Sequence, residues 1–286
     1  MPHPCRIASE RAFTRSHAMT ERLSRRLAYN AIARQYDRAR PRYPAALFDD
    51  IFAYADLQPG ARILEIGCGT GQASLPLAQR GYALDCIELG AALAEFARAN
   101  LATFPKARVI QADFDRVALA PGGYDLVVSA TAFHWLDPET RFGKAQRLLK
   151  ARGALALFWH RPVVTDISRE FFDAVQLVYR DIAPELTRRY HRPPAPDAVA
   201  TEYAELIPAS GCFDELSICK HYLATKYSAA AYTDLLDTFS DHRALEPAKR
   251  RRLFRAIQAL IDLAFSGEVT RETVALLYLA RSHSAR

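Results

Sequence analysis

The chain has 286 residues, of which 50% are hydrophobic and 24% are charged, a balance that is ordinary for a globular protein with a large buried core. No apolar run approaches the roughly 20 residues of a membrane-spanning helix, so no membrane association is expected. A net charge of +6 permits nucleic-acid binding without requiring it. The five scattered cysteines include no C-x-x-C pair, so we expect reduced thiols, no metal site and a cytoplasmic location.

The N-terminal region reads differently from the rest of the chain. It contains several arginines but no apolar stretch of the kind found in a secretory signal. We interpret residues 1–20 as a disordered extension and residues 21–286 as one domain. Within that domain, residues 21–50 are interpreted as a lid segment that leads into the first strand.

Strand and helix signals alternate between residues 62 and 159. Apolar strands are predicted at 63–67, 83–89, 109–112, 126–130 and 154–159, with helical stretches between them. Such alternation implies right-handed βαβ units and a mostly parallel sheet. A ligand site is then expected at the carboxyl ends of the strands.

The pattern changes after residue 159. Residues 162–211 have an apolar stripe at helical spacing, which predicts a helical insertion over the carboxyl edge of the sheet, where substrate pockets are built. Strand character returns at 216–222 and 273–279. The basic run at 249–252 adjoins apolar residues at helical spacing and is interpreted as the solvated face of an amphipathic helix. The predicted fold is therefore α/β, a Rossmann-like, doubly wound, seven-stranded and mostly parallel sheet with a helical insertion after the fifth strand.

The first predicted strand ends in an acidic residue and three glycines at alternate positions, Glu65-x-Gly67-x-Gly69-x-Gly71. Glycine has no Cβ and tolerates positive φ, so such a loop lets a ligand touch bare backbone. A strand-to-helix turn of this kind is typical of nucleotide and nucleoside sites. A dinucleotide fingerprint has its third glycine one position later, and a P-loop ends in G-K-[ST]. The spacing instead resembles the first motif of class I S-adenosylmethionine-dependent methyltransferases.

The ends of the next three predicted strands suit this cofactor. Glu88 places a carboxylate where it can accept hydrogen bonds from both ribose hydroxyls. Asp113 is expected to accept from the adenine amino group and Phe114 to pack on the ring, while Ser129 and Ala130 leave room for the methionine part. The residues predicted to contact the cofactor are Tyr36, Arg40, Glu65, Gly67, Cys68, Gly69, Gly71, Gln72, Glu88, Leu89, Asp113, Phe114, Ser129, Ala130 and His134.

The resemblance extends over residues 28–161, which look like the small-molecule (type 11) group of these enzymes, the group that includes the trans-aconitate-type methyltransferases. Residues 36–44 are similar to that group's N-terminal segment, which closes over the cofactor. Residues 124–127 and 133–135 match its fourth-strand motif. Residues 148–153 resemble its Leu-Lys-Pro-Gly-Gly turn, with Ala-Arg in place of Pro-Gly. The resemblance implies that the single domain is a methyltransferase domain.

The same resemblance implies in-line transfer of the methyl group to an oxygen, nitrogen or carboxylate oxygen atom of a small molecule, with S-adenosylhomocysteine as product. Holding the two reactants together can lower the activation barrier by roughly 7–11 kcal/mol, and a general base lowers it by about 3–5 kcal/mol. Because proximity has the larger effect, a general base is optional. His134 is the first candidate base, and the alternative is a hydrogen-bonded wall residue. Arg40 is expected to bind the cofactor carboxylate or an anionic substrate. The residues assigned to the acceptor are Tyr43, Trp135, His160 and His242.

Two other functions remain open at this point. A nucleobase or RNA methyltransferase would fit the basic charge, but the [DNS]-P-P-[YF] run typical of base-amino methylation is absent at 129–132. A protein that binds S-adenosylmethionine or S-adenosylhomocysteine without turnover would keep the same cofactor residues. The sequence does not identify the acceptor, and it does not predict the oligomeric state.

Overall fold

The computed structural model describes residues 29–188 and 191–283. The extension predicted at residues 1–20 and the beginning of the lid segment lie outside these described residues. Within the described ranges, no helix is both long and apolar enough to cross a membrane. The same ranges hold no cluster of His, Cys, Asp and Glu side chains that would bind a metal ion.

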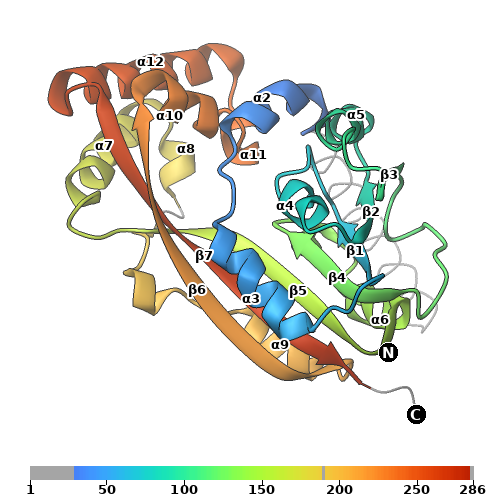
Figure 1. Ribbon diagram of the computed structural model, residues 1–286. Helices are drawn as coiled ribbons and strands as arrows, with labels where there is room; N and C mark the ends of the chain where they lie inside the picture. Colours follow the sequence, from blue (N-terminus) through green and yellow to red (C-terminus); the bar gives the residue numbers. More distant parts are fainter. Residues whose placement is uncertain (1–28, 189–190, 284–286) are drawn as a thin grey trace, which may run out of the picture.

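The centre of the molecule is a seven-stranded sheet in the order β3-β2-β1-β4-β5-β7-β6 (Figure 1). The first five strands of that order pair in parallel, whereas β7 is antiparallel to both of its neighbours. The prediction of a seven-stranded, mostly parallel α/β sheet is confirmed. The strands are β1 Arg62–Ile66, β2 Ala83–Glu88, β3 Ala107–Gln111, β4 Tyr124–Ala130, β5 Leu149–Val163, β6 Phe213–Ser228 and β7 Glu268–Ser282.

Helices cover both faces of the sheet because successive strand side chains point to opposite sides. In β1, Ile63 packs with α3 Ala45–Ala55, α4 Ser74–Gln79 and α5 Ala91–Asn100. Its neighbour Leu64 packs on the opposite face with α6 Arg141–Leu148 and α9 Tyr203–Ala209. Both residues are fully buried, as expected for a sheet enclosed by helices.

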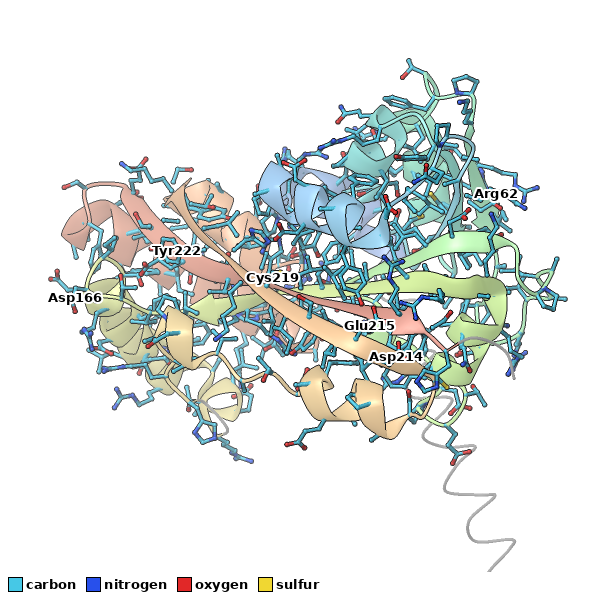
Figure 2. The ribbon with its side chains drawn as sticks, turned by 60° about the horizontal axis from the view of Figure 1, so that its bottom comes forward. Arg62, Asp166, Asp214, Glu215, Cys219 and Tyr222 are labelled. Carbon is cyan, nitrogen blue, oxygen red and sulfur yellow. The ribbon has the colours of Figure 1, made fainter. Side chains whose placement is uncertain are left out.

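The last three strands are longer than predicted. β5 has 15 residues, β6 has 16 and β7 has 15, and they continue well past the carboxyl ends of the other strands. Glu215, Cys219 and Tyr222 mark the course of β6 (Figure 2), which among the described residues pairs only with β7, at the edge of the sheet. The apolar pattern underestimated β6 because this strand alternates between exposed and partly buried positions along most of its length.

A cluster of helices, hereafter the cap, sits at the far ends of these long strands (Figure 1). The predicted insertion at 162–211 supplies only part of it, because its last helix, α9, packs on the sheet instead. The segment between β6 and β7 supplies the rest. The cap helices are α7 Arg169–Ile182, α8 Pro184–Thr187, α10 Ala229–Leu236, α11 Ser240–Arg243 and α12 Pro247–Ala264.

The basic run lies on α12, as predicted, with Leu253, Ile257 and Ile261 buried on the opposite face. Its charges find partners within the cap. Lys249 pairs with Glu185 at 2.9 Å, and Arg250 pairs with Asp237 at 3.1 Å. Two charges of the basic run are thus used within the fold.

A fully buried carboxylate on β7, Glu272, fixes the start of α7. It accepts hydrogen bonds from the Thr165 backbone N–H at 3.0 Å and the Thr165 hydroxyl at 2.8 Å, and from the hydroxyls of Ser168 and Tyr222. Burial alone would raise the pKa of Glu272, but these hydrogen bonds outweigh it and hold the pKa below its usual value.

Replacing Glu272 by alanine is expected to lower the free energy of unfolding at pH 7 by about 3 kcal/mol, because several charged hydrogen bonds are lost together. Since the folded-state pKa is depressed, this contribution is present above the unfolded-state pKa and is lost as pH falls through the folded-state value. Urea unfolding at pH 7 and pH 3 measures both effects. Glu268→Ala, which removes an exposed pair with Lys226, is the control and is expected to cost under about 1 kcal/mol. Equal losses for the two variants would contradict this account.

Candidate active site

The glycine loop joins β1 to α4 in a conformation that only glycine adopts without strain. Gly67, Gly69 and Gly71 have φ values of +71°, +58° and +99°. A Cβ built on Gly67 would lie 2.4 Å from the Cβ of Ala132, which belongs to the loop after β4. The first glycine is therefore required both by the backbone conformation and by the close approach of the neighbouring loop.

Glu88 ties this loop to the next strand end. One carboxylate oxygen accepts from the Gly69 N–H at 2.9 Å, and the other accepts from the Gly90 N–H at 2.8 Å. The side chain is buried but lines a cavity over the carboxyl ends of the strands. A carboxylate held by two backbone amides is a rigid acceptor at the edge of that cavity.

That first cavity crosses the ends of β1, β2, β3 and β4 and is closed by α2 Ala33–Ala39. Ten residues predicted for the site line it: Tyr36, Arg40, Gly67, Gly69, Glu88, Leu89, Phe114, Ala130, His134 and Trp135. Eight lining residues were not predicted: Tyr29, Ile66, Ile87, Leu93, Ala112, Thr131, Ala132 and Leu136. Four of these eight, Ile66, Ile87, Ala112 and Leu136, are apolar side chains adjacent to a predicted residue.

The lid segment closes the first cavity and also contacts the cap. Arg38 pairs with Asp234 of α10 at 2.8 Å, and Arg40 donates to the Thr238 carbonyl oxygen at 2.7 Å. The Asn30 side chain accepts from the Ala92 N–H at 2.6 Å, at the start of α5. These contacts hold the lid between the sheet and the cap (Figure 1).

A second cavity adjoins the first and lies between the glycine loop, the lid and the cap. It shares Tyr36, Arg40, Gly67, Gly69, Ala130 and Thr131 with the first cavity. Other predicted residues that line it are Tyr43, Glu65, Cys68, Gln72 and His160. Besides the shared Thr131, five lining residues were not predicted: Pro41, Ala73, Leu235, Phe239 and Arg271.

Glu65, at the end of β1, faces the second cavity. One of its oxygens accepts from the Ser74 hydroxyl at 2.5 Å, whereas Oε1 has no partner among the described residues. Complete burial raises the pKa of this carboxyl group to about 7. The site therefore holds a buried acceptor that a cationic group would both satisfy and ionise.

His134 lines the first cavity in a defined tautomer. Its Nδ1 accepts from the Trp159 indole N–H at 3.0 Å, so the proton of the neutral ring is on Nε2. Burial, with Arg161 and Arg141 nearby, lowers the pKa of His134 to about 4. A ring in this state donates a hydrogen bond at neutral pH and has no free lone pair, which does not suit the predicted general base.

His160 and Tyr43 form a wall of the second cavity. Their rings stack with centroids 4.4 Å apart, and the Tyr43 hydroxyl is 2.7 Å from the Thr131 hydroxyl. Neither nitrogen of His160 has a hydrogen-bond partner among the described residues. Burial, with Arg271 and Arg40 nearby, lowers the pKa of His160 to about 3, so this ring is also neutral at pH 7.

Four predicted residues do not line either cavity. The Asp113 carboxylate accepts from the Asp115 N–H at 3.2 Å, and the Ser129 hydroxyl donates to the Ile66 carbonyl oxygen of the neighbouring strand β1 at 2.9 Å. Gly71 only provides the positive φ for the turn into α4. The acceptor role expected of His242 is corrected, because this ring is buried in the cap against Tyr179 at 2.7 Å and Asp241 at 2.8 Å.

Comparison with known proteins identifies the domain that carries these cavities. Residues 64–157 match a family model described as a methyltransferase domain. This chain contains a methyltransferase domain. The matched residues run from β1 into β5, so they include the glycine loop and Glu88 but neither the lid nor the cap.

Relatives of the methyltransferase domain agree with this identification. Malonyl-[acyl-carrier protein] O-methyltransferase of Geobacter sulfurreducens is 38% identical over 135 residues, which are 46% of this chain and 48% of the relative. Trans-aconitate 2-methyltransferase of Deinococcus radiodurans is 30% identical over 109 residues, 38% and 41% of the two chains. The alignments thus span about half the length of these curated relatives.

A solved structure extends the likeness over most of the chain. A protein of Anaeromyxobacter dehalogenans, provisionally classed as a type II methyltransferase, is 25% identical with a TM-score of 0.58. The alignment covers 86% of this chain and 97% of that one. The recognition made from the glycine loop, that of a methyltransferase domain with the class I fold, is confirmed.

Proposed function

We propose that the protein transfers the methyl group of S-adenosylmethionine to a small-molecule acceptor in the second cavity. The observation that carries this proposal is the Glu88 carboxylate, which two backbone amides hold at the edge of the first cavity beside the glycine loop. A fixed carboxylate at the end of the second strand is the group that a ribose needs, because it can accept from two hydroxyls at once.

The residues present fit this cofactor. The first cavity offers Glu88 for the ribose and the apolar Leu89 and Phe114 for the adenine ring. In the second cavity, Arg40 Nε and Glu65 Oε1 are buried without partners among the described residues, and Arg40 also lines the first cavity. A carboxylate and an ammonium group, as on the methionine part, would satisfy both atoms.

When bound, S-adenosylmethionine supplies an electrophilic methyl group on a positively charged sulfur atom. The chain itself contributes position and exclusion of water. Lid, cap and glycine loop enclose the junction of the cavities, so that an acceptor in the second cavity is held close to the first. Since His134 and His160 are both weak bases here, we assign the rate enhancement to proximity, which can supply roughly 7–11 kcal/mol.

Tritiated methyl transfer tests the proposed function. The protein is incubated with S-adenosyl[methyl-³H]methionine and either a protein-free, nuclease-treated metabolite extract or purified RNA. We expect label in the small-molecule fraction, together with S-adenosylhomocysteine. Label in RNA would establish the nucleic-acid alternative. Binding of S-adenosylhomocysteine without any transfer would indicate a non-catalytic binding protein.

The affinity for S-adenosylhomocysteine is expected to fall about tenfold from pH 8 to pH 6. Because burial raises the pKa of Glu65 to about 7 in the free protein, a proton occupies this carboxyl group at lower pH. That proton must leave before the ammonium group of the ligand can bind. Isothermal titration calorimetry at several pH values across this range measures how the affinity changes with pH. The Glu65→Gln variant is expected to bind S-adenosylhomocysteine more weakly, with an affinity that does not change with pH in this range. An equal pH dependence in both proteins would contradict the assignment of Glu65 to the ammonium group.

A further inference from the structure

Arg271 lines the second cavity but belongs to neither the glycine loop nor the lid. It lies on β7, on the same face of the sheet as His160 of β5, and its guanidinium carbon is 5.5 Å from the centre of the Phe239 ring. It lines the second cavity and is absent from the lining of the first. Its position is therefore on the acceptor side of the proposed reaction.

No carboxylate pairs with Arg271 in the part of the chain that the structure describes, although acidic partners are common nearby. In the cap, Arg243 and Arg250 both pair with Asp237, at 3.2 Å and 3.1 Å. Arg271, in contrast, is only partly exposed and has an aromatic ring as its neighbour. A guanidinium kept partly out of water without an anion is costly, so a ligand that supplies the anion would bind with a net gain.

The other groups that face this cavity do not supply the missing negative charge. His160 and the Tyr43 hydroxyl are neutral at pH 7, since burial depresses the pKa of the histidine and raises that of the tyrosine. Thr131 is uncharged, and Arg40 adds a second positive charge. Glu65 is the one acidic side chain in the described lining, and the proposed function assigns it to the ammonium group of the cofactor.

We propose that Arg271 binds a carboxylate group of the methyl acceptor, and that the acceptor is therefore a small carboxylic acid. This inference rests on the proposed function, which places the acceptor in the second cavity. After Arg40 is assigned to the cofactor carboxylate, one guanidinium remains for one negative charge, which favours a carboxylate over a dianionic phosphate. The planar guanidinium also matches a carboxylate with two parallel hydrogen bonds.

Acid and amide pairs of the same shape test this proposal in the protein saturated with S-adenosylhomocysteine. The probes are benzoate with benzamide and succinate with succinamide, and phenylphosphonate represents the phosphate class. Calorimetric titration is expected to show that at least one acid binds ten or more times more tightly than its amide. Equal binding of acid and amide, no binding of either acid, or tighter binding of phenylphosphonate would overturn the proposal.

The Arg271→Met variant tests whether Arg271 causes the preference for the acid over the amide. In Arg271→Met, the affinity for the acid is expected to be at least tenfold lower than in the wild-type protein. The affinity for S-adenosylhomocysteine is expected to stay within twofold of the wild-type value. Arg255→Met removes the same charge from an exposed position on α12 and is expected to leave both affinities unchanged. An unaltered acid preference in Arg271→Met would overturn the proposal. If wild-type protein failed to bind S-adenosylhomocysteine at all, the proposed function itself would be wrong, so the two failures are distinct.

Discussion

Glu88→Ala is expected to abolish measurable binding of S-adenosylhomocysteine. The carboxylate is the proposed ribose acceptor and also accepts from the backbone of the glycine loop and of the loop after β2, at 2.9 Å and 2.8 Å. Charged hydrogen bonds contribute about 1.5–3 kcal/mol each, so losing the two proposed ribose contacts corresponds to roughly a 10²–10⁴-fold weaker affinity. Loosening of the two loops adds to that loss.

Calorimetry on the folded variant measures this effect. Glu88→Gln keeps one acceptor oxygen and is expected to retain a weak, measurable affinity. Glu95→Ala removes an exposed carboxylate from the adjoining helix and serves as the matched control, with unchanged affinity expected. Wild-type affinity in a folded Glu88→Ala protein would remove this residue from the cofactor site.

Gly67→Ala is expected to destabilise the protein by about 3–5 kcal/mol, because two effects combine. An alanine at a φ of +71° is strained, and its Cβ would lie 2.4 Å from the Cβ of Ala132. Gly60 has a similar φ of +86°, but a Cβ at that position would have nothing within 4 Å. Gly60→Ala therefore measures the backbone strain alone, and it is expected to lower the free energy of unfolding by about 1–2 kcal/mol. Urea unfolding measures both variants.

A double variant separates the close contact from the backbone strain at the same position. In Gly67→Ala combined with Ala132→Gly, the nearest atom to the new Cβ is the Cα of residue 132, at 3.9 Å in the present geometry. We therefore expect the double variant to recover most of the stability lost beyond the level of Gly60→Ala. If Gly67→Ala costs no more than Gly60→Ala, the two loops are not packed as described.

The first cavity was largely predictable because its chemistry is encoded locally. A parallel sheet brings the carboxyl ends of consecutive strands to one edge, so Gly67, Glu88 and Phe114 were placed together from strand pattern and residue type alone. Asp113 and Ser129 were expected beside them but line neither cavity. A polar side chain at a strand end can also bond to nearby backbone, as Asp113 does to the Asp115 N–H and Ser129 to the Ile66 carbonyl oxygen of β1, and sequence does not distinguish these outcomes.

The second cavity was less predictable because its walls come from distant parts of the chain. Arg271 reaches it only through the antiparallel pairing of β7 with β5, and Phe239 only through the fold of the cap. A histidine in the same cap segment, His242, was expected to contact the acceptor but is buried against Tyr179. Side-chain direction in such a segment depends on helix packing that periodicity alone does not specify.

A crystal structure of the protein with S-adenosylhomocysteine tests the central claim most directly. We predict electron density for the adenosyl group over the strand ends, with the ribose hydroxyls on Glu88, the amino group at Glu65 and the sulfur atom facing the second cavity. Density for the ligand elsewhere on the surface, or a ribose out of hydrogen-bond reach of Glu88, would contradict the assignment of these two cavities to cofactor and acceptor.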